Sequence, residues 1–368
     1  MQLVHLAAVG FRNLAPVDLR IEHPFTIIHG PNGQGKTNLL ETIYLLCTLK
    51  PLRGSRMSEV IHWDKDSMSI GAGVQIDGVE RRYRVDLSSS GRVATVDGQR
   101  VKALSQYFSD VRCVSFTPAD GNIVFNEPAG RRKWVDRAAF TRNPVHLDLI
   151  RAYHRCRDQK SALLRKGLHT TDTLDVLDQQ LSAMGAKVIH RRVQVLAELQ
   201  PHVHALHAQI SGTQEEILLR YKQPIVGNSE QELQQALLER FHQLRSEEIR
   251  RRSVLAGPQR DDVEILLAGK PARQFGSRGQ VRSIVLALKL AELLAATERG
   301  QRPLFLLDDL SSELDEMRTK QLVRTLEKLG TQVFITTTDP SFLSTLPSSK
   351  TALIHVQNGI LSQREKEV

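Results

Sequence analysis

The sequence is poor in cysteine and in aromatic residues. Its three cysteines, Cys47, Cys113 and Cys156, lie far apart and form no C-x-x-C pair. This argues against a disulfide framework and a thiolate zinc site, and it is typical of a protein of the reducing cytosol. Aromatic residues make up only 5% of the chain. If the protein binds nucleic acid, we therefore expect it to follow the backbone of a duplex rather than to stack on single-stranded bases.

Long hydrophobic runs are also absent. No run approaches the ~18 apolar residues of a membrane-spanning helix, and Met1–His5 has no basic segment followed by an apolar core. We therefore expect a cytoplasmic protein without a membrane partner. Lys and Arg number 50 against 41 Asp and Glu, and the net charge of +9 favours a polyanionic partner, nucleic acid first. At 368 residues the chain exceeds the ~250–300 residues of one hydrophobic core, which predicts two lobes.

One complete phosphate-binding motif is present. Residues 30–37 fit G-x-x-x-x-G-K-[ST], after the apolar run Phe25–Ile28 and before apolar residues at helical spacing. A strand, a loop and a helix in this order are what a P-loop requires. We predict that Lys36 reaches the β- and γ-phosphates of ATP and that Thr37 ligates Mg²⁺. The predicted ATP-binding residues are Gly30, Pro31, Asn32, Gly33, Gln34, Gly35, Lys36 and Thr37.

An apolar strand near the C-terminus ends in two carboxylates. Leu304–Leu307 is followed by Asp308 and Asp309. P-loop enzymes hold Mg²⁺ with such an acid, and we predict this role for Asp308. Asp309 would lie on the other face of the strand and orient or deprotonate the attacking water. The alternative is that the Asp pair caps the next helix.

A third segment, Phe275–Gln280, precedes a long apolar helix. Ser277 and Gly279 would offer a hydroxyl and free N–H groups at the helix start, which are the components of an anion site. Ser-x-Gly at this position is also a common helix cap.

The order of the elements predicts an α/β fold with an inserted lobe. We expect strands at Leu3–Val9, Val17–Ile21, Phe25–Ile28, Ser69–Ile76, Val79–Leu87, Arg92–Val96 and Val111–Phe116, mostly antiparallel. The chain then turns to long helical patterns, in which Pro201 should kink or end a helix. Alternating strands and helices return after about residue 254. We therefore predict an ATPase head from residues 1–116 and 253–368, and a helical arm lobe from residues 117–252.

Four segments in this order resemble the ABC-type ATPase heads of the SMC and Rad50 group: residues 30–37, 277–280, 308–309 and 312–315. Over the whole chain the sequence is most similar to the RecF family of bacterial recombination mediators. Phe11–Asn13, Lys36–Glu41, Pro118–Asp136 and Gly257–Asp262 match segments of that family.

The resemblance implies a function. Two heads would sandwich two ATP molecules as an ATP-dependent homodimer, in which Ser277, Gly279 and Gln280 close over the γ-phosphate of the partner and Asp315 couples the two sites. Lys36 and Asp309 would catalyse weak, DNA-dependent ATP hydrolysis. The family likeness further implies binding to gapped or junction DNA, action with RecR and RecO, and indirectly the loading of RecA.

Two departures favour weak hydrolysis and leave alternatives open. Asp309 stands where transporter ATPases carry Glu, and Thr336–Asp339 contains no switch histidine, so a threonine hydroxyl would sense the γ-phosphate instead. One alternative is an SMC- or Rad50-like, ATP-gated DNA clamp in which hydrolysis is incidental. Another is the nucleotide-binding subunit of a transporter.

Basic residues cluster in and around the predicted arm lobe. Lys and Arg on one face bind phosphates without sequence specificity, although a solvated helix surface has the same composition. The predicted DNA contacts are Arg131, Arg132, Lys133, Arg155 and Arg251.

Overall fold

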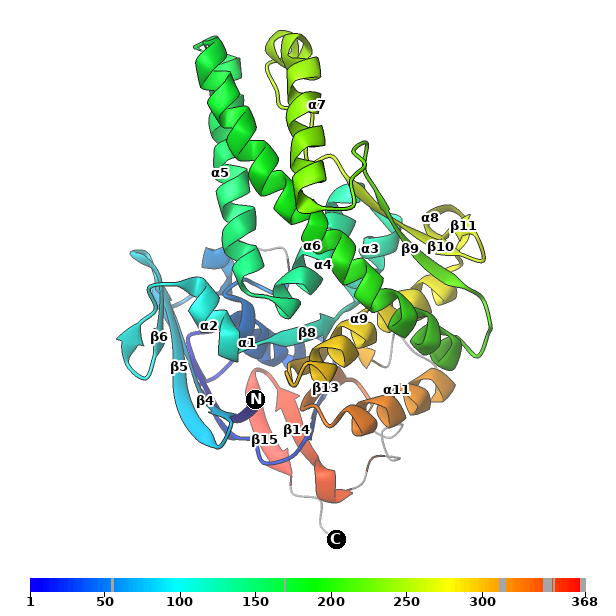
Figure 1. Ribbon diagram of the computed structural model, residues 1–368. Helices are drawn as coiled ribbons and strands as arrows, with labels where there is room; N and C mark the ends of the chain where they lie inside the picture. The colour runs from blue at the N-terminus through cyan, green and yellow to red at the C-terminus, as the bar shows by residue number, and fades with distance from the viewer. Residues whose placement is uncertain (54–55, 169, 311–315, 340–345, 347, 365–368) are drawn as a thin grey trace. The chain divides into compact units, whose positions relative to one another are not determined.

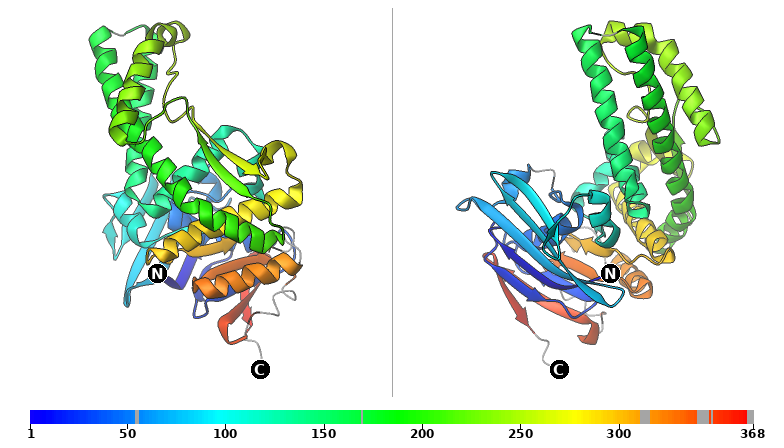
Figure 2. Two further views of the ribbon diagram at one scale, coloured as in Figure 1. Left: turned by 45° about the vertical axis from the view of Figure 1, so that its right-hand side comes forward. Right: turned by 60° about the vertical axis from the view of Figure 1, so that its left-hand side comes forward.

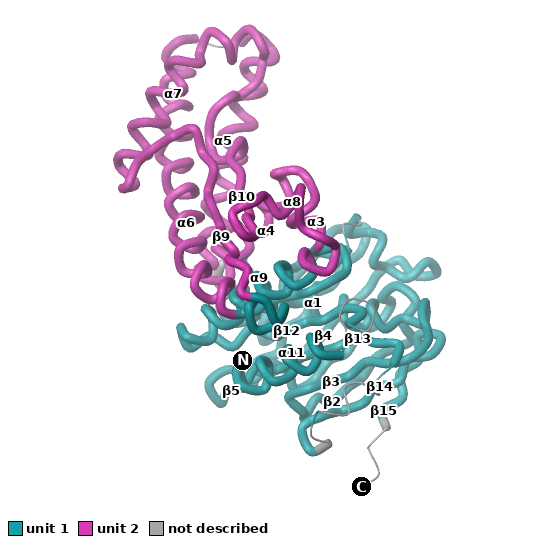
Figure 3. The backbone as a smooth tube through the Cα atoms, turned by 90° about the vertical axis from the view of Figure 1, so that its right-hand side faces the viewer, with its two compact units in different colours: residues 1–120, 206–213, 282–368 teal, residues 121–205, 214–281 magenta. Residues whose placement is uncertain are grey.

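The computed structural model describes residues 1–53, 56–168, 170–310, 316–339, 346 and 348–364. It divides into two compact units, shown in different colours in Figure 3. Unit 1 contains residues 1–120, 206–213 and 282–368, and unit 2 contains residues 121–205 and 214–281. Within the described ranges, no helix is both long and apolar enough to cross a membrane.

Unit 1 contains a six-stranded sheet built from both ends of the chain. Its order is β15-β14-β3-β13-β12-β8, and all pairs are parallel except β14 with β15. The strand before the phosphate loop, β3, and the strand before the acidic pair, β12, therefore share one sheet. The strands are β3 (Phe25–His29), β8 (Cys113–Phe116), β12 (Leu304–Leu307), β13 (Val333–Thr337), β14 (Thr351–Gln357) and β15 (Ile360–Arg364).

The second sheet of unit 1 is antiparallel, as predicted, with the order β2-β1-β4-β5-β6-β7. It forms a layer of its own, blue and cyan in Figure 2. Two of its hairpins turn at Asp77-Gly78 and Asp97-Gly98, where all four residues have positive φ, the geometry of type I′ turns. The strands are β1 (Gln2–Val9), β2 (Val17–Arg20), β4 (Ser67–Ile76), β5 (Val79–Ser88), β6 (Gly91–Val96) and β7 (Gln99–Arg100).

Helix α1 (Lys36–Thr48) lies between these two sheets. It contacts β8 and β13 of the first sheet and β4 and β5 of the second. Its buried residues surround the helix, from Leu39 to Cys47, as expected of a helix covered on both sides. Among the described residues, unit 1 also contains the helices α2 (Leu104–Asp110) and α11 (Glu316–Leu329) and 3₁₀ turns at Met57–Val60 and Ser348–Lys350, and a 3₁₀ turn at Pro118–Gly121 lies at its boundary with unit 2.

Unit 2 combines helices with a small antiparallel sheet of order β11-β10-β9. Figure 1 labels α3 (Asn122–Phe125), α4 (Pro128–Arg142), α5 (Val145–Lys166), α7 (Glu230–Arg251), α8 (Ala272–Phe275), β9 (Ile217–Lys222), β10 (Asp262–Leu267) and β11 (Lys270–Pro271). Two further helices cross the boundaries of the units in sequence, α6 (Thr171–Ser211) and α9 (Arg278–Glu298). Residues 253–281, which we expected in the head, fall in unit 2 because β10 pairs with β9.

Helix α6 does not end at Pro201, contrary to one of the two outcomes that we expected. The helix continues to Ser211. The preceding residue, Gln200, anchors it to β9: its Nε2 donates to the carbonyl of Ile217 and its Oε1 accepts from the amide of Leu219, each at 2.7 Å. Buried residues beyond the proline, such as Val203, continue the apolar face. Tertiary contacts therefore override the local preference of proline.

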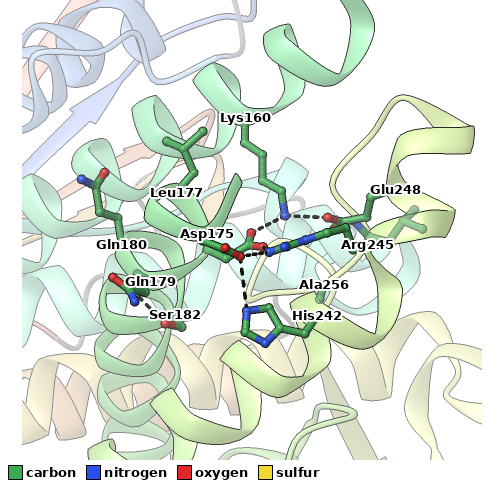
Figure 4. Close-up of polar contacts among 12 residues, drawn as sticks. Lys160, Asp175, Leu177, Gln179, Gln180, Ser182, His242, Arg245, Glu248 and Ala256 are labelled. Carbon is green, nitrogen blue, oxygen red and sulfur yellow. Dashed lines mark hydrogen bonds and ion pairs between the residues drawn. The ribbon is translucent and has the colours of Figure 1, made fainter. Parts of the chain in front are cut away.

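A buried cluster of charges joins three helices of unit 2 (Figure 4). Lys160 of α5 forms ion pairs at 2.5 Å with Asp178 of α6 and Glu248 of α7, and all three side chains are 1% exposed. Arg245 of α7 also pairs with Asp178, at 2.8 Å. The Lys160 ammonium lies 4.5 Å from the ring centre of Phe241. These helices are therefore held together by charge as well as by apolar packing.

Candidate nucleotide-binding site

The phosphate loop joins β3 to α1 through three glycines with positive φ. Gly30, Gly33 and Gly35 have φ of 142°, 79° and 113°, which side-chain-bearing residues rarely adopt. Helix α1 begins at Lys36, directly after Gly35. Its first N–H groups have no intrahelical acceptor, so the loop and the helix start form an anion-binding site.

The ammonium group of Lys36 is held inside the loop. Its Nζ donates to the carbonyls of Gly30 at 2.7 Å and Pro31 at 2.8 Å. The residue is only 7% exposed. Burial lowers the pKa of Lys36, and the nearby carboxylates of Asp309 and Asp308 partly oppose this shift. The geometry places one cation against the loop that would surround the phosphates.

Asp308 lies beside Thr37 and Thr336. Its Oδ1 accepts hydrogen bonds from the Thr37 hydroxyl at 2.7 Å and from the Thr336 hydroxyl at 2.8 Å. Burial raises the pKa of Asp308, while both hydrogen bonds act to lower it. A hydroxyl and a carboxylate are the oxygen donors that Mg²⁺ prefers. The pair predicted from the sequence to hold the metal is therefore adjacent in the structure.

The sheet order explains why a third residue joins this pair. Strand β13 lies between β3 and β12, and in parallel strands the carboxyl ends meet at one edge. Thr336, near the end of β13, therefore lies between the phosphate loop and the acidic strand. The sequence suggested a threonine here in place of a switch histidine, but it did not predict the contact with Asp308.

Asp309 is positioned differently from the sequence-based expectation. Strand β12 ends at Leu307, so the alternation of side chains along a strand does not set the direction of Asp309. Its backbone is left-handed, with φ of 54°. Its amide donates to the Thr336 hydroxyl at 2.7 Å. Thr336 thus fixes both carboxylate residues, one through its side chain and the other through its backbone.

Comparisons with known proteins identify the family of this chain. Residues 2–362 match the model of the RecF/RecN/SMC N-terminal domain family. The chain is 38% identical to the DNA replication and repair protein RecF of Geobacter metallireducens, covering 96% of this chain and 97% of that protein. It is 40% identical to RecF of Anaeromyxobacter dehalogenans, covering 98% and 99%. The chain belongs to the RecF family. This confirms the resemblance inferred from the motifs.

Solved structures support the RecF fold. A structure described as the recombination mediator protein RecF with ATP in the RecFOR pathway aligns with a TM-score of 0.90 and 29% identity, covering 98% of this chain and 97% of that one. An SMC head bound to the C-terminal winged-helix domain of ScpA aligns with a TM-score of 0.57 and 15% identity, covering 98% and 96%. The predicted ABC-type fold, with its antiparallel layer and helical lobe, is therefore confirmed.

Residues 277–280, which the resemblance to RecF predicts to contact the γ-phosphate of a partner subunit, form a helix cap. The Ser277 hydroxyl accepts from the amide of Gln280 at 3.2 Å, and Oε1 of Gln280 accepts from the amide of Ser277 at 2.9 Å. This reciprocal pair is a capping box. The capping box gives Ser277 and Gln280 a role in starting α9. The contact of Ser277, Gly279 and Gln280 with the nucleotide of a second subunit remains a prediction. Asp315, predicted to couple the two sites, lies outside the described residues.

The basic residues predicted to contact DNA occupy different environments in unit 2. Arg131 is 5% exposed and binds Asp262 through two hydrogen bonds of 2.7 and 2.9 Å. Arg132 is partly buried and donates to the carbonyl of Asp261 at 2.7 Å. These two arginines therefore have partners inside the protein. The sequence pattern alone could not distinguish them from exposed cations. Lys133, Arg155 and Arg251 are exposed.

These contacts bring together two sequence segments that the RecF resemblance had identified separately. Arg131 and Arg132 belong to Pro118–Asp136, and their partners end Gly257–Asp262. Within the same network, Arg192 donates to both oxygens of Asp136, at 2.7 and 2.8 Å. The two segments therefore stabilise each other, which gives them a structural role in unit 2.

Asp261 makes the stability of this network depend on pH. The residue is 2% exposed and accepts a hydrogen bond from the Tyr221 hydroxyl at 2.7 Å. Burial raises the pKa of Asp261 to about 6, above the ~3.9 of an unfolded chain. The folded protein therefore retains this proton to a higher pH than the unfolded chain does. The contribution of Asp261 to the free energy of unfolding is complete below about pH 4 and is lost as the pH rises to about 6.

Asp261→Asn is expected to stabilise the protein by about 2 kcal/mol at pH 7.5. The amide oxygen of Asn still accepts from Tyr221, but it carries no charge to bury. Urea unfolding of both proteins at pH 4.5 and 7.5 measures the difference, which should be smaller at the acidic pH. A difference that is the same at both pH values would contradict the assignment.

Proposed function

We propose that this protein binds ATP and Mg²⁺ in the phosphate loop, dimerises around two nucleotides, and binds gapped or junction DNA as a recombination mediator. The observation that carries the nucleotide part is the contact of Thr37 and Thr336 with Asp308 behind a complete P-loop. The DNA part is supported by membership of the RecF family and by the net charge of +9. The similar solved structure is of RecF with ATP and is assigned to the RecFOR pathway. This supports RecR and RecO as partners and an indirect role in loading RecA.

The proposed hydrolysis is slow transfer of the γ-phosphoryl group to water. Thr37 and Asp308 would hold Mg²⁺, which supplies neutralisation of phosphate charge. Lys36 adds a second positive charge at the loop. Asp309 would orient the attacking water, held in position through its amide by Thr336. Ser277 and Gly279 of a second subunit would complete the site.

The exposed cations Lys133, Arg155 and Arg251 are the proposed phosphate contacts on DNA. Arg251 forms an ion pair with Glu247 at 2.5 Å, but its side chain is 62% exposed. Exposed ion pairs of this kind contribute ~0–1 kcal/mol, so a DNA phosphate can replace the carboxylate at low cost. Arg131 is not included, because its guanidinium is buried against Asp262.

Sedimentation with a fluorescent gapped duplex tests the proposal. The wild-type protein should be a monomer without nucleotide, and it should sediment with the duplex as a dimer in ATP and Mg²⁺. Ser277→Arg should remove both the dimer and the DNA complex, because a long charged side chain would occupy the space of the partner's γ-phosphate. A monomer under all conditions would contradict the two-site model.

A second variant separates dimerisation from DNA binding. Lys133→Glu combined with Arg155→Glu should leave the ATP-dependent dimer intact and weaken duplex binding, with a shallower dependence of affinity on salt.

Because Ser277 also caps α9, Ser277→Asp is the control for loss of the cap: it keeps a good N-cap but places a negative charge against the γ-phosphate. It should therefore fold like the wild type and fail to dimerise.

A further inference from the structure

The turn between β14 and β15 contacts the phosphate loop directly. The amide of Asn358 donates to Oε1 of Gln34 at 2.7 Å, and the amide of Gly359 donates to the backbone carbonyl of Gln34 at 2.9 Å. Two consecutive amides of one turn therefore hold one residue of the loop, through both its side chain and its backbone. All three residues belong to unit 1.

The other side of the turn packs against Asn13. A Cβ added to Gly359 would lie 2.0 Å from the carbonyl oxygen of Asn13. Asn13 in turn reaches the loop: its Oδ1 would lie 3.1 Å from a Cβ on Gly35, and it accepts a hydrogen bond of 2.7 Å from Asn38 of α1. The turn, Asn13 and the loop are thus in mutual close contact.

Two other hairpins of the same unit show what is unusual about this turn. Asp77-Gly78, Asp97-Gly98 and Asn358-Gly359 all have positive φ at both residues, as type I′ turns do. Gly78 and Gly98 are exposed, and an added Cβ would meet no atom within 4 Å at either position. Gly359 is buried. The glycine of the same turn type is therefore exposed in two hairpins and packed against neighbouring backbone in the third.

We propose that the Asn358-Gly359 turn is a positioning element that holds the phosphate loop in its nucleotide-binding shape and so sets the affinity for the nucleotide diphosphate moiety. This inference rests on the proposed ATP site. The loop binds phosphate through backbone N–H groups, whose directions change if Gln34 shifts. The turn contacts the loop between Gly33 and Gly35, two of its positive-φ residues. Gly30 is backed by the same hairpin, since an added Cβ there would lie 2.3 Å from the carbonyl of Val356.

Gly359→Ala tests the proposal, with Gly78→Ala as the matched control. Both substitutions impose the same left-handed strain on alanine in a type I′ turn, but only the Cβ at position 359 collides with Asn13. We expect Gly359→Ala to raise the dissociation constants of both ADP and ATP by about tenfold relative to Gly78→Ala, because loss of about one hydrogen bond to a charged phosphate corresponds to roughly this factor. The affinities for ADP and ATP should fall by the same factor, because the loop holds the phosphates that both nucleotides share.

Gln34→Met gives an independent measurement. It keeps the length of the side chain and removes the 2.7 Å acceptor for the Asn358 amide together with the longer bond of 3.4 Å from Nε2 to the carbonyl of Asn32. It should weaken the binding of both nucleotides by about threefold. Binding is measured by titration with fluorescent ADP and ATP analogues well below the melting temperature of each variant. If Gly359→Ala fails to fold, Gln34→Met decides the question.

The outcomes separate this inference from the proposed function. A wild-type protein that binds neither nucleotide would overturn the ATP site itself. Wild-type binding with equal affinities in Gly359→Ala and Gly78→Ala, or with unchanged affinity in Gln34→Met, would overturn the role of the turn alone. A loss confined to ATP would also overturn it, because that result indicates a sensor of the γ-phosphate rather than a support of the loop.

Discussion

Lys36→Met is expected to weaken ATP binding by about a hundredfold, because hydrogen bonds to charged groups contribute ~1.5–3 kcal/mol and 1.4 kcal/mol corresponds to a factor of ten. Methionine retains the volume of a side chain that is only 7% exposed, so packing changes little. The ammonium that donates to the carbonyls of Gly30 and Pro31 is lost together with its attraction for phosphate. Isothermal titration with ATP and Mg²⁺ measures the effect.

Lys36→Arg is the matched control for charge. It keeps the cation but not the compact ammonium that fits between two carbonyls, so we expect nucleotide binding to persist and hydrolysis to fall. If this variant still binds gapped DNA in ATP and supports repair, the protein acts as an ATP-gated clamp in which hydrolysis is incidental. An affinity of Lys36→Met within threefold of the wild type would contradict the assigned role of the lysine.

The sequence predicted the main parts of the site because each is a local pattern. The phosphate loop and the acidic strand are contiguous segments with diagnostic residues, and their strands follow from apolar periodicity. The sheet order is a long-range property, and β13 between β3 and β12 is what brings Thr336 to Asp308. The left-handed backbone of Asp309 was not predicted, because the strand ends at Leu307 and Asp309 lies beyond it.

Other features could not be predicted because they depend on partners distant in sequence. Arg131 belongs to a run of cations and resembles a DNA contact, yet its partner is Asp262, 131 residues away. The turn at Asn358-Gly359 is 324 residues from Gln34 and carries the same signature as two exposed hairpins. Pro201 was expected to kink or end a helix, but the helix continues to Ser211, where Gln200 is hydrogen-bonded to β9. Local sequence patterns thus predicted the helices, strands and motifs, whereas the contacts between residues distant in sequence could be found only in the structure.

The buried ion pairs of Lys160 give the largest effect expected on stability. Lys160→Met should destabilise the helices of unit 2 by about 3–5 kcal/mol, because removal of one partner leaves uncompensated buried charge. Asp178 retains Arg245 at 2.8 Å, so the cost falls mainly on Glu248, whose Oε1 also accepts a hydrogen bond from the amide of Leu255. Hydrogen exchange of peptides from α5, α6 and α7 measures the loss. Lys166→Met, an exposed position at the end of the same helix, should change protection by no more than ~0.5 kcal/mol.

A second substitution distinguishes lost charge balance from lost packing. Glu248→Gln keeps the acceptor for the Leu255 amide and removes the carboxylate that Lys160→Met leaves unpaired. If charge is the cause, the double variant should recover more than half of the lost protection, and the two substitutions should be strongly non-additive. If the lost contact of the Lys160 ammonium with the Phe241 ring is the cause, the double variant should be no more stable than Lys160→Met. Recovery would show that the ion pairs of Lys160 with Asp178 and Glu248 are interdependent and that charge balance holds the three helices together.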